Sequence, residues 1–257
     1  MRARKRFGQN FLQDPSVIDR IAFAINPAPS DHILEIGPGH GALTSRLSNT
    51  GCKLDLVEID RDLVAELTPR FPNAMIHSAD ILQFDFSSIA GAEKLRVVGN
   101  LPYNISTPLL FRLFHHSDLI QDMYFMLQLE VVNRLTASLS TGQYGRLSIM
   151  TRLFCDAEKL FDVPPEAFSP RPKVMSAIVR LTPRHDPPEV SDLAQFEKLL
   201  IHAFSQRRKT IRNALKNWCS AAELSALDID PSLRPENIPA ERFIACANFL
   251  ATKGIRL

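Results

Sequence analysis

The chain has 257 residues, of which 45% are hydrophobic and 23% charged, and its formal net charge is +2 at pH 7. These values are typical of a soluble globular protein with one large domain, or one domain and a small appendage. No segment approaches the roughly 20 uninterrupted apolar residues of a membrane span. The four scattered cysteines form no C-x-x-C pair, so they fit reduced thiols better than disulfides or a zinc site.

The N-terminus is basic but continues into Phe7-Gly8-Gln9-Asn10 instead of a long apolar stretch. The sequence therefore predicts no signal peptide, and we expect a cytoplasmic protein with no membrane partner. The seven histidines show no metal-binding spacing, so no metal is expected. Because the total charge is nearly balanced, any inference about nucleic acid must rest on where the charges lie.

Up to about Arg184, short apolar segments alternate with helical patterns, which is the signature of a parallel sheet with crossover helices. The expected strands are residues 32–36, 54–59, 74–78, 96–99, 123–128 and 176–181. The expected helices between them include residues 42–48, 61–70 and 108–114. The pattern predicts an α/β domain of Rossmann-like type.

A break follows at Pro183, Pro187 and Pro188, and no strand pattern is evident beyond it. Short amphipathic helices are expected at residues 193–204, 210–219, 221–227 and 240–251. We therefore predict two domains, residues 1–184 and residues 185–257, the second small and all-helical.

A glycine-rich loop, Glu35-Ile36-Gly37-Pro38-Gly39-His40-Gly41, ends the first expected strand and opens a helix. Glycines at this place let the backbone approach a ligand and open the helix N-terminus to it. Read as Gly37-x-Gly39-x-x-Ala42, the loop also satisfies the dinucleotide fingerprint. By itself it does not separate NAD from other adenosine cofactors.

Polar side chains end the next strands as well. Glu58 ends the second strand, where an acid can accept both ribose hydroxyls, and Asp80 follows the third, where it can meet an adenine amine. Each acid taken alone is better explained as a helix N-cap or a surface residue. Together with Glu35 and Asn100 they form a row along one sheet edge, which favours an adenosine cofactor.

The fourth strand ends in Asn100-Leu101-Pro102-Tyr103. The Asn100 oxygen and a backbone carbonyl can accept both hydrogens of an exocyclic amine, and Tyr103 offers a face on which a base can stack. Alone, the tetrapeptide could equally be a tight turn. Beside the acids it favours methyl transfer to an amine, and hence S-adenosylmethionine over NAD, with neither metal nor covalent intermediate required.

These motifs, in this order, resemble those of the rRNA adenine N6,N6-dimethyltransferases, and in particular the bacterial members that act on small-subunit rRNA. The matching strings are residues 5–12 (KRFGQNFL), 35–44 (EIGPGHGALT), 57–60 (VEID), 99–106 (GNLPYNIS), 130–134 (EVVNR), 144–148 (YGRLS), 168–174 (FSPRPKV) and 204–212 (FSQRRKTIR). One position departs from the family pattern: Leu129 stands where a basic or polar residue is usual.

The resemblance implies a Rossmann-like S-adenosylmethionine-dependent methyltransferase domain, followed by a helical domain that binds and orients RNA. The cofactor residues it implies are Asn10, Leu12, Gly37, Glu58, Asp80 and Asn100. The target it implies is 16S rRNA within an immature small ribosomal subunit, at two adjacent adenosines of the hairpin loop near the 3′ end. We expect four methyl groups to be transferred in all, by a monomer.

The expected catalytic residues are Asn100, Leu101, Tyr103 and Phe168. Phe168 stands before Pro170 and Pro172 on a stiff loop and could form a stacking slot with Tyr103 for a base that has left its stack. The alternative is that Phe168 anchors the loop to the core.

Basic residues gather in two acid-free stretches. The first holds Arg2, Arg4, Lys5 and Arg6, and the second holds Arg207, Arg208, Lys209, Arg212 and Lys216. A basic run is most often a solvated face, but two dense clusters in a nearly neutral chain suit phosphate. We expect RNA binding by Arg207, Arg208, Lys209 and Arg212, although the first two could instead connect the domains.

Three other functions remain open on the sequence alone. The large-subunit rRNA adenine methyltransferases share the catalytic domain, a non-catalytic RNA-binding or assembly factor could use the same fold, and the glycine loop permits an NAD-dependent oxidoreductase. The residues after that loop disfavour the oxidoreductase.

Overall fold

The computed structural model describes residues 10–205 and 208–255, which belong to two compact units. The first unit comprises the described parts of Met1–Val132 together with Cys155–Pro183, and the second comprises those of Asn133–Phe154 and Arg184–Leu257. Residues 133–154 thus group with the C-terminal helices, whereas the sequence pattern placed them in the first domain. The RNA-binding role of the second unit stays a prediction.

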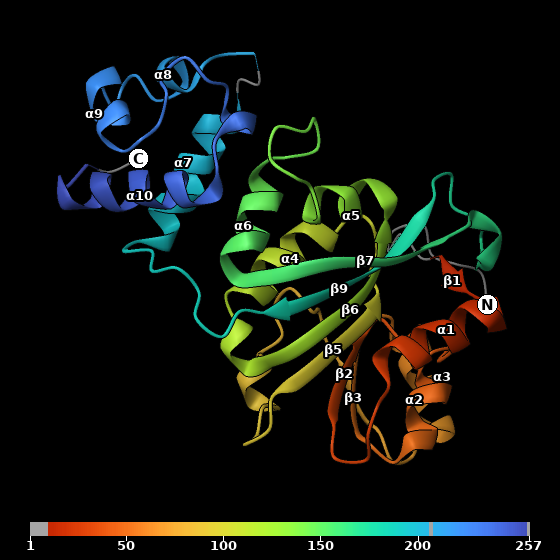
Figure 1. Ribbon diagram of the computed structural model, residues 1–257. Coiled ribbons are helices and arrows are strands. Elements are labelled where there is room, and N and C mark those ends of the chain that lie inside the picture. Colours follow the sequence, from red (N-terminus) through yellow and green to blue (C-terminus); the bar gives the residue numbers. More distant parts are fainter. Residues whose placement is uncertain (1–9, 206–207, 256–257) are drawn as a thin grey trace. The chain divides into compact units, whose positions relative to one another are not determined.

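The first unit is built on a seven-stranded sheet with the order β4-β3-β2-β5-β6-β9-β7, seen near the middle of Figure 1. The strands are β2 (His32–Ile36), β3 (Lys53–Glu58), β4 (Met75–Ser78), β5 (Leu95–Asn100), β6 (Ile120–Gln128), β7 (Cys155–Val163) and β9 (Ser176–Pro183). From β4 to β6 all neighbouring strands are parallel. The carboxyl ends of β2, β3, β4 and β5 therefore meet at one edge of the sheet.

The expectation of a parallel sheet is wrong at β9, which runs antiparallel to both β6 and β7. The apolar pattern of β9 predicts that the strand is buried, but it does not predict the direction in which the strand runs. Strand β7 was not expected at all, because polar residues such as Asp156, Glu158 and Lys159 interrupt its apolar pattern. A strand at the sheet edge tolerates such residues since only one of its sides is paired.

A second, two-stranded sheet joins distant parts of the chain. Strand β1 (Phe11–Leu12) pairs antiparallel with β8 (Phe168–Ser169), with Leu12 opposite Phe168. The main-chain N–H of Gln13 donates to the carbonyl of Ala167 at 2.8 Å. The N-terminal segment is therefore fixed onto the loop that precedes β9.

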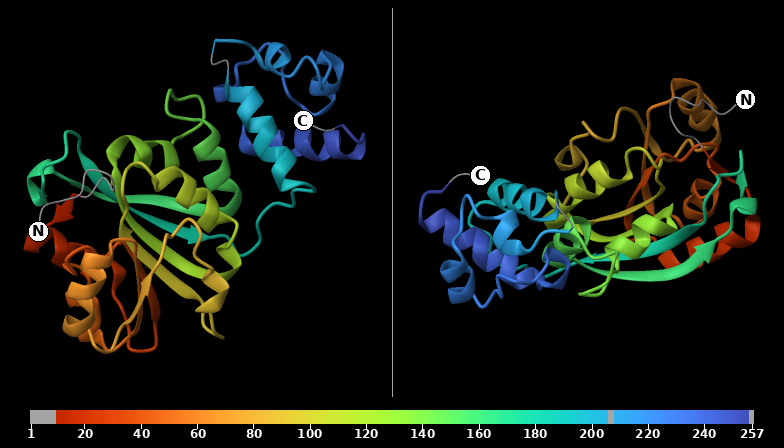
Figure 2. Two further views of the ribbon diagram at one scale, coloured as in Figure 1. Left: turned by 180° about the vertical axis from the view of Figure 1, so that it is seen from behind. Right: turned by 90° about the horizontal axis from the view of Figure 1, so that it is seen from above.

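The helices of the first unit lie before, between and after the parallel strands along the chain. They are α1 (Pro15–Ile25), α2 (Thr44–Leu47), α3 (Arg61–Arg70), α4 (Ser106–Phe114) and α5 (Leu129–Leu135), the last of which continues into the second unit. Helix α1 begins after Asp14, whose carboxylate accepts from the main chain of Ser16 and Val17. Viewed from behind, α4 lies in front of the sheet (Figure 2).

The core of the first unit forms around the central strands. All five residues of β2 are buried, and so are the first five of β5, as expected of strands covered on both faces. Gly99 in β5 allows a close approach to β2, because a Cβ atom there would lie 2.5 Å from the carbonyl oxygen of Ile36. The ends of β2 and β5 are thereby held together beside the glycine loop.

The second unit contains helices alone among its described residues. They are α6 (Arg146–Phe154), α7 (Leu193–Ser205), α8 (Ile211–Ala214), α9 (Ala221–Ala226) and α10 (Ala240–Thr252). Helices α6, α7 and α10 pack against one another around buried side chains that include Leu199, Phe196 and Phe243.

Short 3-10 helices occur in both units, at Ser48–Thr50, Phe86–Ser88, Ser117–Leu119, Pro165–Ala167 and Pro235–Asn237.

Within the described ranges, no helix is both long and apolar enough to cross a membrane.

Candidate active site

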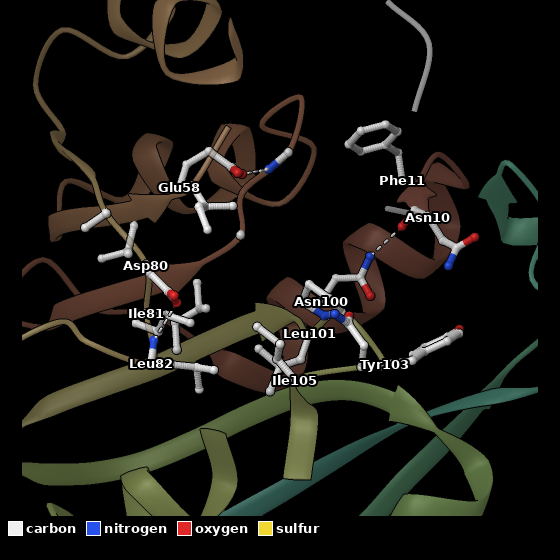
Figure 3. A pocket seen from close by; sticks show the side chains of 18 residues that line it. Asn10, Phe11, Glu58, Asp80, Ile81, Leu82, Asn100, Leu101, Tyr103 and Ile105 are labelled. Carbon is white, nitrogen blue, oxygen red and sulfur yellow. Dashed lines mark hydrogen bonds between the residues drawn. The ribbon is translucent and has the colours of Figure 1, made fainter. Parts of the chain in front are cut away.

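A cavity of about 270 Å³ opens at the carboxyl ends of β2, β3, β4 and β5, and Figure 3 shows the side chains that line it. Five of the residues expected at a cofactor line this cavity, namely Asn10, Gly37, Glu58, Asp80 and Asn100. The sixth, Leu12, lines a smaller cavity of about 90 Å³ that shares Gly37 and Asn100 with the first. The parallel register of the strands is what brings these side chains together.

The glycine loop after β2 forms one wall of the cavity. Gly37 and Gly39 have φ angles of +65° and +58°, a left-handed conformation that glycine adopts without strain. The main-chain N–H of Gly37 donates to the carbonyl of Val57 at 2.9 Å. A Cβ atom on Gly39 would lie 2.9 Å from Cδ1 of Phe11, so glycine is also needed for the N-terminal segment to cross the loop.

Glu58 is held at the end of β3 by two main-chain donors. Its Oε2 accepts from the N–H of Gly39 at 3.3 Å, and its Oε1 accepts from the N–H of Asp60 at 2.9 Å. Burial raises the pKa of Glu58, and these hydrogen bonds oppose the rise. The side chain is 5% exposed yet lines the cavity, which leaves a fixed carboxyl group beside it.

Asp80 and the residues after it form a second wall. Asp80 Oδ1 accepts from the N–H of Leu82 at 2.9 Å, and the apolar side chains of Ile81, Leu82 and Ile105 line the cavity beside it. In Figure 3 the Asp80 carboxylate lies next to Ile81 and Leu82, whereas Ile105 lies beside Leu101. The arrangement offers a flat apolar ring both contact area and an acceptor for an amine.

Asn100 faces these walls from the end of β5. Its Nδ2 donates to the main-chain carbonyl of Asn10 at 2.8 Å, as the dashed line in Figure 3 shows. A carbonyl oxygen can only accept, so the amide must turn its nitrogen to Asn10 and its oxygen away from it. The N-terminal segment thus fixes which end of the amide is left for a ligand.

The residues after Asn100 differ in their surroundings. Leu101 is 1% exposed, and its N–H donates to the carbonyl of Met126 at 3.2 Å, which holds the loop on β6. Tyr103 lines the cavity, and its hydroxyl lies 2.8 Å from Ser176 Oγ. Burial raises the pKa of Tyr103.

Glu35 is a second buried carboxyl group at this edge of the sheet. It is 3% exposed, and its Oε2 accepts from Thr44 Oγ1 at 2.7 Å. Burial raises the pKa of Glu35 to about 7, and the charge of Glu58 adds to the rise. Glu35 lines the smaller cavity with Leu12.

Phe168 is not among the residues that line either cavity. It is 5% exposed and belongs to the hydrophobic cluster that also holds Leu12, Tyr124 and Ile178. This burial supports the alternative that Phe168 anchors its loop to the core. Its stacking role stays a prediction.

The expected RNA-binding residues belong to the second unit. Arg208, Lys209 and Arg212 are exposed, while Arg207 lies outside the described residues. The N-terminal cluster of Arg2, Arg4, Lys5 and Arg6 lies outside them too. Of the two basic stretches, the structure thus describes only part of the second, namely Arg208, Lys209, Arg212 and Lys216.

Several cavity-lining residues were not expected from the sequence, among them Phe11, Ile59 and Ile105. Phe11 lies between two expected residues, Asn10 and Leu12, and could have been found from that string. Ile59 and Ile105 carry no chemical signal, because apolar residues next to strand ends are most often core. Leu129, the position that departs from the family pattern, is half-buried and donates its N–H to the carbonyl of Met175 at 3.0 Å.

The residues present fit an adenosine cofactor. Glu58 is a fixed carboxyl group suited to ribose hydroxyls, Asp80 stands among apolar side chains suited to a base, and Gly37 gives the ligand access to the main chain. Among the described residues, no group of three or more His, Cys, Asp or Glu side chains is arranged to hold a metal ion.

Comparison with known proteins identifies the family. A family model described as ribosomal RNA adenine dimethylase matches residues 1–252. The ribosomal RNA small subunit methyltransferase A of Methylococcus capsulatus is 52% identical over 250 residues, covering 96% of this chain and 97% of that protein. Its namesake from Pseudomonas savastanoi pv. phaseolicola is 54% identical over 260 residues, covering 99% and 97%.

Solved structures agree with these relatives. A dimethyladenosine transferase from Plasmodium falciparum superposes with a TM-score of 0.80 at 28% identity, covering 96% of this chain and 99% of that one. The 23S rRNA methyltransferase ErmE superposes with a TM-score of 0.71 at 27% identity, covering 94% and 100%. The Rossmann-like methyltransferase fold expected from the sequence is confirmed, and the chain belongs to the ribosomal RNA adenine dimethylase family.

Proposed function

We propose that this enzyme transfers methyl groups from S-adenosylmethionine to N6 of two adjacent adenosines near the 3′ end of 16S rRNA, two to each base. The observation that carries the proposal is the Asn100 amide, whose nitrogen is engaged by Asn10 and whose oxygen is left for the cavity. The naming of the relatives as small subunit methyltransferases supports the choice of RNA. The substrate is an immature small subunit, and the enzyme acts as a monomer in the cytoplasm.

S-adenosylmethionine supplies a methyl group already activated by a positive sulfonium. Glu58 accepts hydrogen bonds from the ribose hydroxyls, and Asp80 accepts from the adenine amine of the cofactor. Gly37 would face its methionine part, and Asn10 and Leu12 would lie over the cofactor. The apolar side chains beside Asp80 exclude water from the adenine, which strengthens these polar contacts.

Asn100 acts on the amine of the target adenosine. The lone pair of adenine N6 is delocalised into the ring, which makes it a poor nucleophile. Two acceptors point at its two hydrogens: Asn100 Oδ1 and a main-chain carbonyl at Leu101. They favour the pyramidal form of the nitrogen, which is more nucleophilic. Such preorganised polar groups are often the largest catalytic contribution.

Tyr103 receives the target base by stacking. Phe168 can form the second face of the slot only if its ring leaves the core, where it is 5% exposed. Base–aromatic stacking contributes about 1–3 kcal/mol per base, which offsets part of the free energy of taking an adenosine out of its stack. The proton released from N6 passes to water.

A second candidate is methylation of large-subunit rRNA. The TM-score of 0.71 with the 23S rRNA methyltransferase ErmE favours it, because the two structures share their architecture over 94% of this chain. A non-catalytic assembly factor is the third candidate, and the intact set of Glu58, Asp80, Asn100 and Tyr103 argues against it.

The test uses methyl-labelled S-adenosylmethionine with two substrates, small subunits that lack the 3′-terminal adenine methylations and naked large-subunit rRNA. We expect label on two adjacent adenosines of the small-subunit RNA alone, with digestion products that contain N6,N6-dimethyladenosine. Label on the large-subunit RNA would assign the second candidate. Absence of label with intact cofactor binding would favour the assembly factor.

A further inference from the structure

Ser176, the first residue of β9, carries a fully buried hydroxyl group. Its side chain is 0% exposed, and its backbone lies between Gln128 of β6 and Val163 of β7. A buried hydroxyl requires a hydrogen-bond partner, and Ser176 Oγ lies 2.8 Å from the Tyr103 hydroxyl. No other side-chain hydrogen bond of Ser176 is formed within the described part of the chain.

Tyr103 depends on this contact for the orientation of its ring. The residue lies on the loop after β5 and lines the cavity, and Ser106 Oγ donates to its main-chain carbonyl at 3.2 Å. That bond fixes the backbone but leaves the ring free to turn about its side-chain torsions. The bond to Ser176 ties the far end of the ring to the central sheet.

A tyrosine at this position needs an explanation beyond stacking. A base stacks on a ring face, and phenylalanine offers the same face without a hydroxyl that needs a partner. We infer that Ser176 is a positioning residue, which holds the Tyr103 ring in the orientation that receives the target base. This inference rests on the proposed function, because it takes Tyr103 as the stacking surface.

A double-mutant cycle tests the inference. Tyr103→Phe keeps the ring and removes its hydroxyl, and Ser176→Ala removes the partner. We expect each single variant to lower kcat/KM for RNA by about 3- to 10-fold, the range of one net hydrogen bond, through a higher KM for RNA. The double variant should be no worse than either single one. Losses that multiply in the double variant would overturn the inference.

Stability and cofactor binding separate positioning from a structural role. Each single substitution leaves one hydroxyl group unpaired, whereas the double variant removes both. The double variant should therefore recover stability but not RNA turnover. In Ser176→Ala the Kd for S-adenosylmethionine should stay unchanged, because Ser176 lines neither cavity. Thr50→Ala is the control, because Thr50 belongs to the first unit, lines neither cavity, and its partly buried hydroxyl donates to the carbonyl of Leu47 at 2.7 Å. It should lower stability and leave the KM for RNA unchanged.

A second readout needs no RNA. The chain has three tyrosines, so 3-fluorotyrosine labelling should give three sets of ¹⁹F signals, and Tyr103→Phe assigns one of them. In Ser176→Ala we expect the Tyr103 signal to shift or split, with much smaller changes at Tyr124 and Tyr144. An unchanged Tyr103 signal would refute the inference that Ser176 holds the Tyr103 ring in position.

The outcomes distinguish this inference from the proposed function. A wild-type enzyme that labels no RNA would defeat the proposed function and the positioning role with it. A wild type that labels RNA, with unchanged kinetics in Ser176→Ala, would refute the positioning role alone. The cycle is measured on whichever RNA the wild type methylates.

Discussion

At Asn100 one hydrogen bond decides which end of an amide faces the cavity. The two ends of the amide are almost alike in shape but opposite in polarity, and only the oxygen can accept from an amine. The bond from Nδ2 to the carbonyl of Asn10, at 2.8 Å, removes the ambiguity. Catalysis by this residue therefore depends on a group that lies 90 positions earlier in the chain.

Asn100→Ala should lower kcat by at least about 100-fold, the effect of removing one preorganised polar group. Asn100→Asp should be nearly as poor, because a carboxylate cannot donate to the Asn10 carbonyl and is repelled by it. Single-turnover transfer at saturating S-adenosylmethionine measures both, and Asn73→Ala, at an exposed asparagine, is the control. An Asn100→Asp enzyme with near-normal turnover would show that the bond to Asn10 is dispensable.

Glu35 links folding to pH. Burial raises its pKa to about 7, whereas glutamate in an unfolded chain titrates near pH 4.3, as a rough reference value. The folded state therefore keeps this proton to a higher pH than the unfolded state does. The associated stability is fully present below about pH 4 and is lost as the pH rises to about 7.

Glu35→Gln should remove this pH dependence, because glutamine does not titrate and still accepts from Thr44. Relative to the variant, the wild type without ligand should lose about 3 kcal/mol of unfolding free energy between pH 4 and 8. Urea unfolding of both proteins at several pH values measures the difference. Parallel pH profiles for the two proteins would contradict the assignment.

At the scale of elements, the glycine loop and β1 are in direct contact, so that a change in one displaces the other. Phe11 of β1 crosses Gly39 so closely that a Cβ atom there would lie 2.9 Å from its ring, and the positive φ of Gly39 adds strain for any other residue. Strand β1 is in turn held by β8. One methyl group added at Gly39 would therefore displace both the glycine loop and the N-terminal segment.

Gly39→Ala should raise the Kd for S-adenosylmethionine by about 10-fold or more, because it combines backbone strain with displacement of Phe11. Isothermal titration measures the Kd. Gly91→Ala is the control, since a Cβ atom there meets nothing within 4 Å, and its Kd should match that of the wild type. Equal affinities for the two variants would show that the crossing of Phe11 over Gly39 has no part in cofactor binding.

The elements also show what sequence patterns can predict. The strands that end at Glu58 and Asn100 follow from apolar runs closed by polar residues, and the cavity follows from their parallel order. The direction of β9 could not be predicted, because apolar periodicity is the same in either direction. Strand β1 has two residues, and its partner Phe168 lies more than 150 residues away, so no local pattern identifies it.

At the scale of the whole molecule, we expect the first unit to bind the cofactor and the target base, and the second to contact the RNA backbone. The family and the Rossmann-like fold are confirmed by the comparisons, because strings distributed over the whole chain carry far more information than any one motif. The role of the basic stretch near α8 stays a prediction. Exposure of Arg208, Lys209 and Arg212 is what phosphate contacts require.

Arg212→Glu should weaken RNA binding and reduce the slope of log K against log salt by about 1, because one phosphate contact is lost. Filter binding at several salt concentrations measures both quantities. Lys94→Glu makes the same change of charge at an exposed residue of the first unit, and we expect a smaller effect on affinity. Equal effects of the two variants would show that the basic stretch near α8 acts on RNA binding only through the net charge of the protein.

The acceptor for Asn100 is a main-chain carbonyl, and this limits what mutational scanning can reveal. Any substitution at Asn10 other than a backbone-altering one keeps that carbonyl, so a tolerated alanine there says nothing about the bond to Asn100. A library of side-chain substitutions would therefore measure only what the side-chain amide of Asn10 contributes, and not its main-chain carbonyl. An ester in place of the peptide bond between residues 10 and 11 would weaken the carbonyl as an acceptor, and chemical ligation can introduce it near the N-terminus.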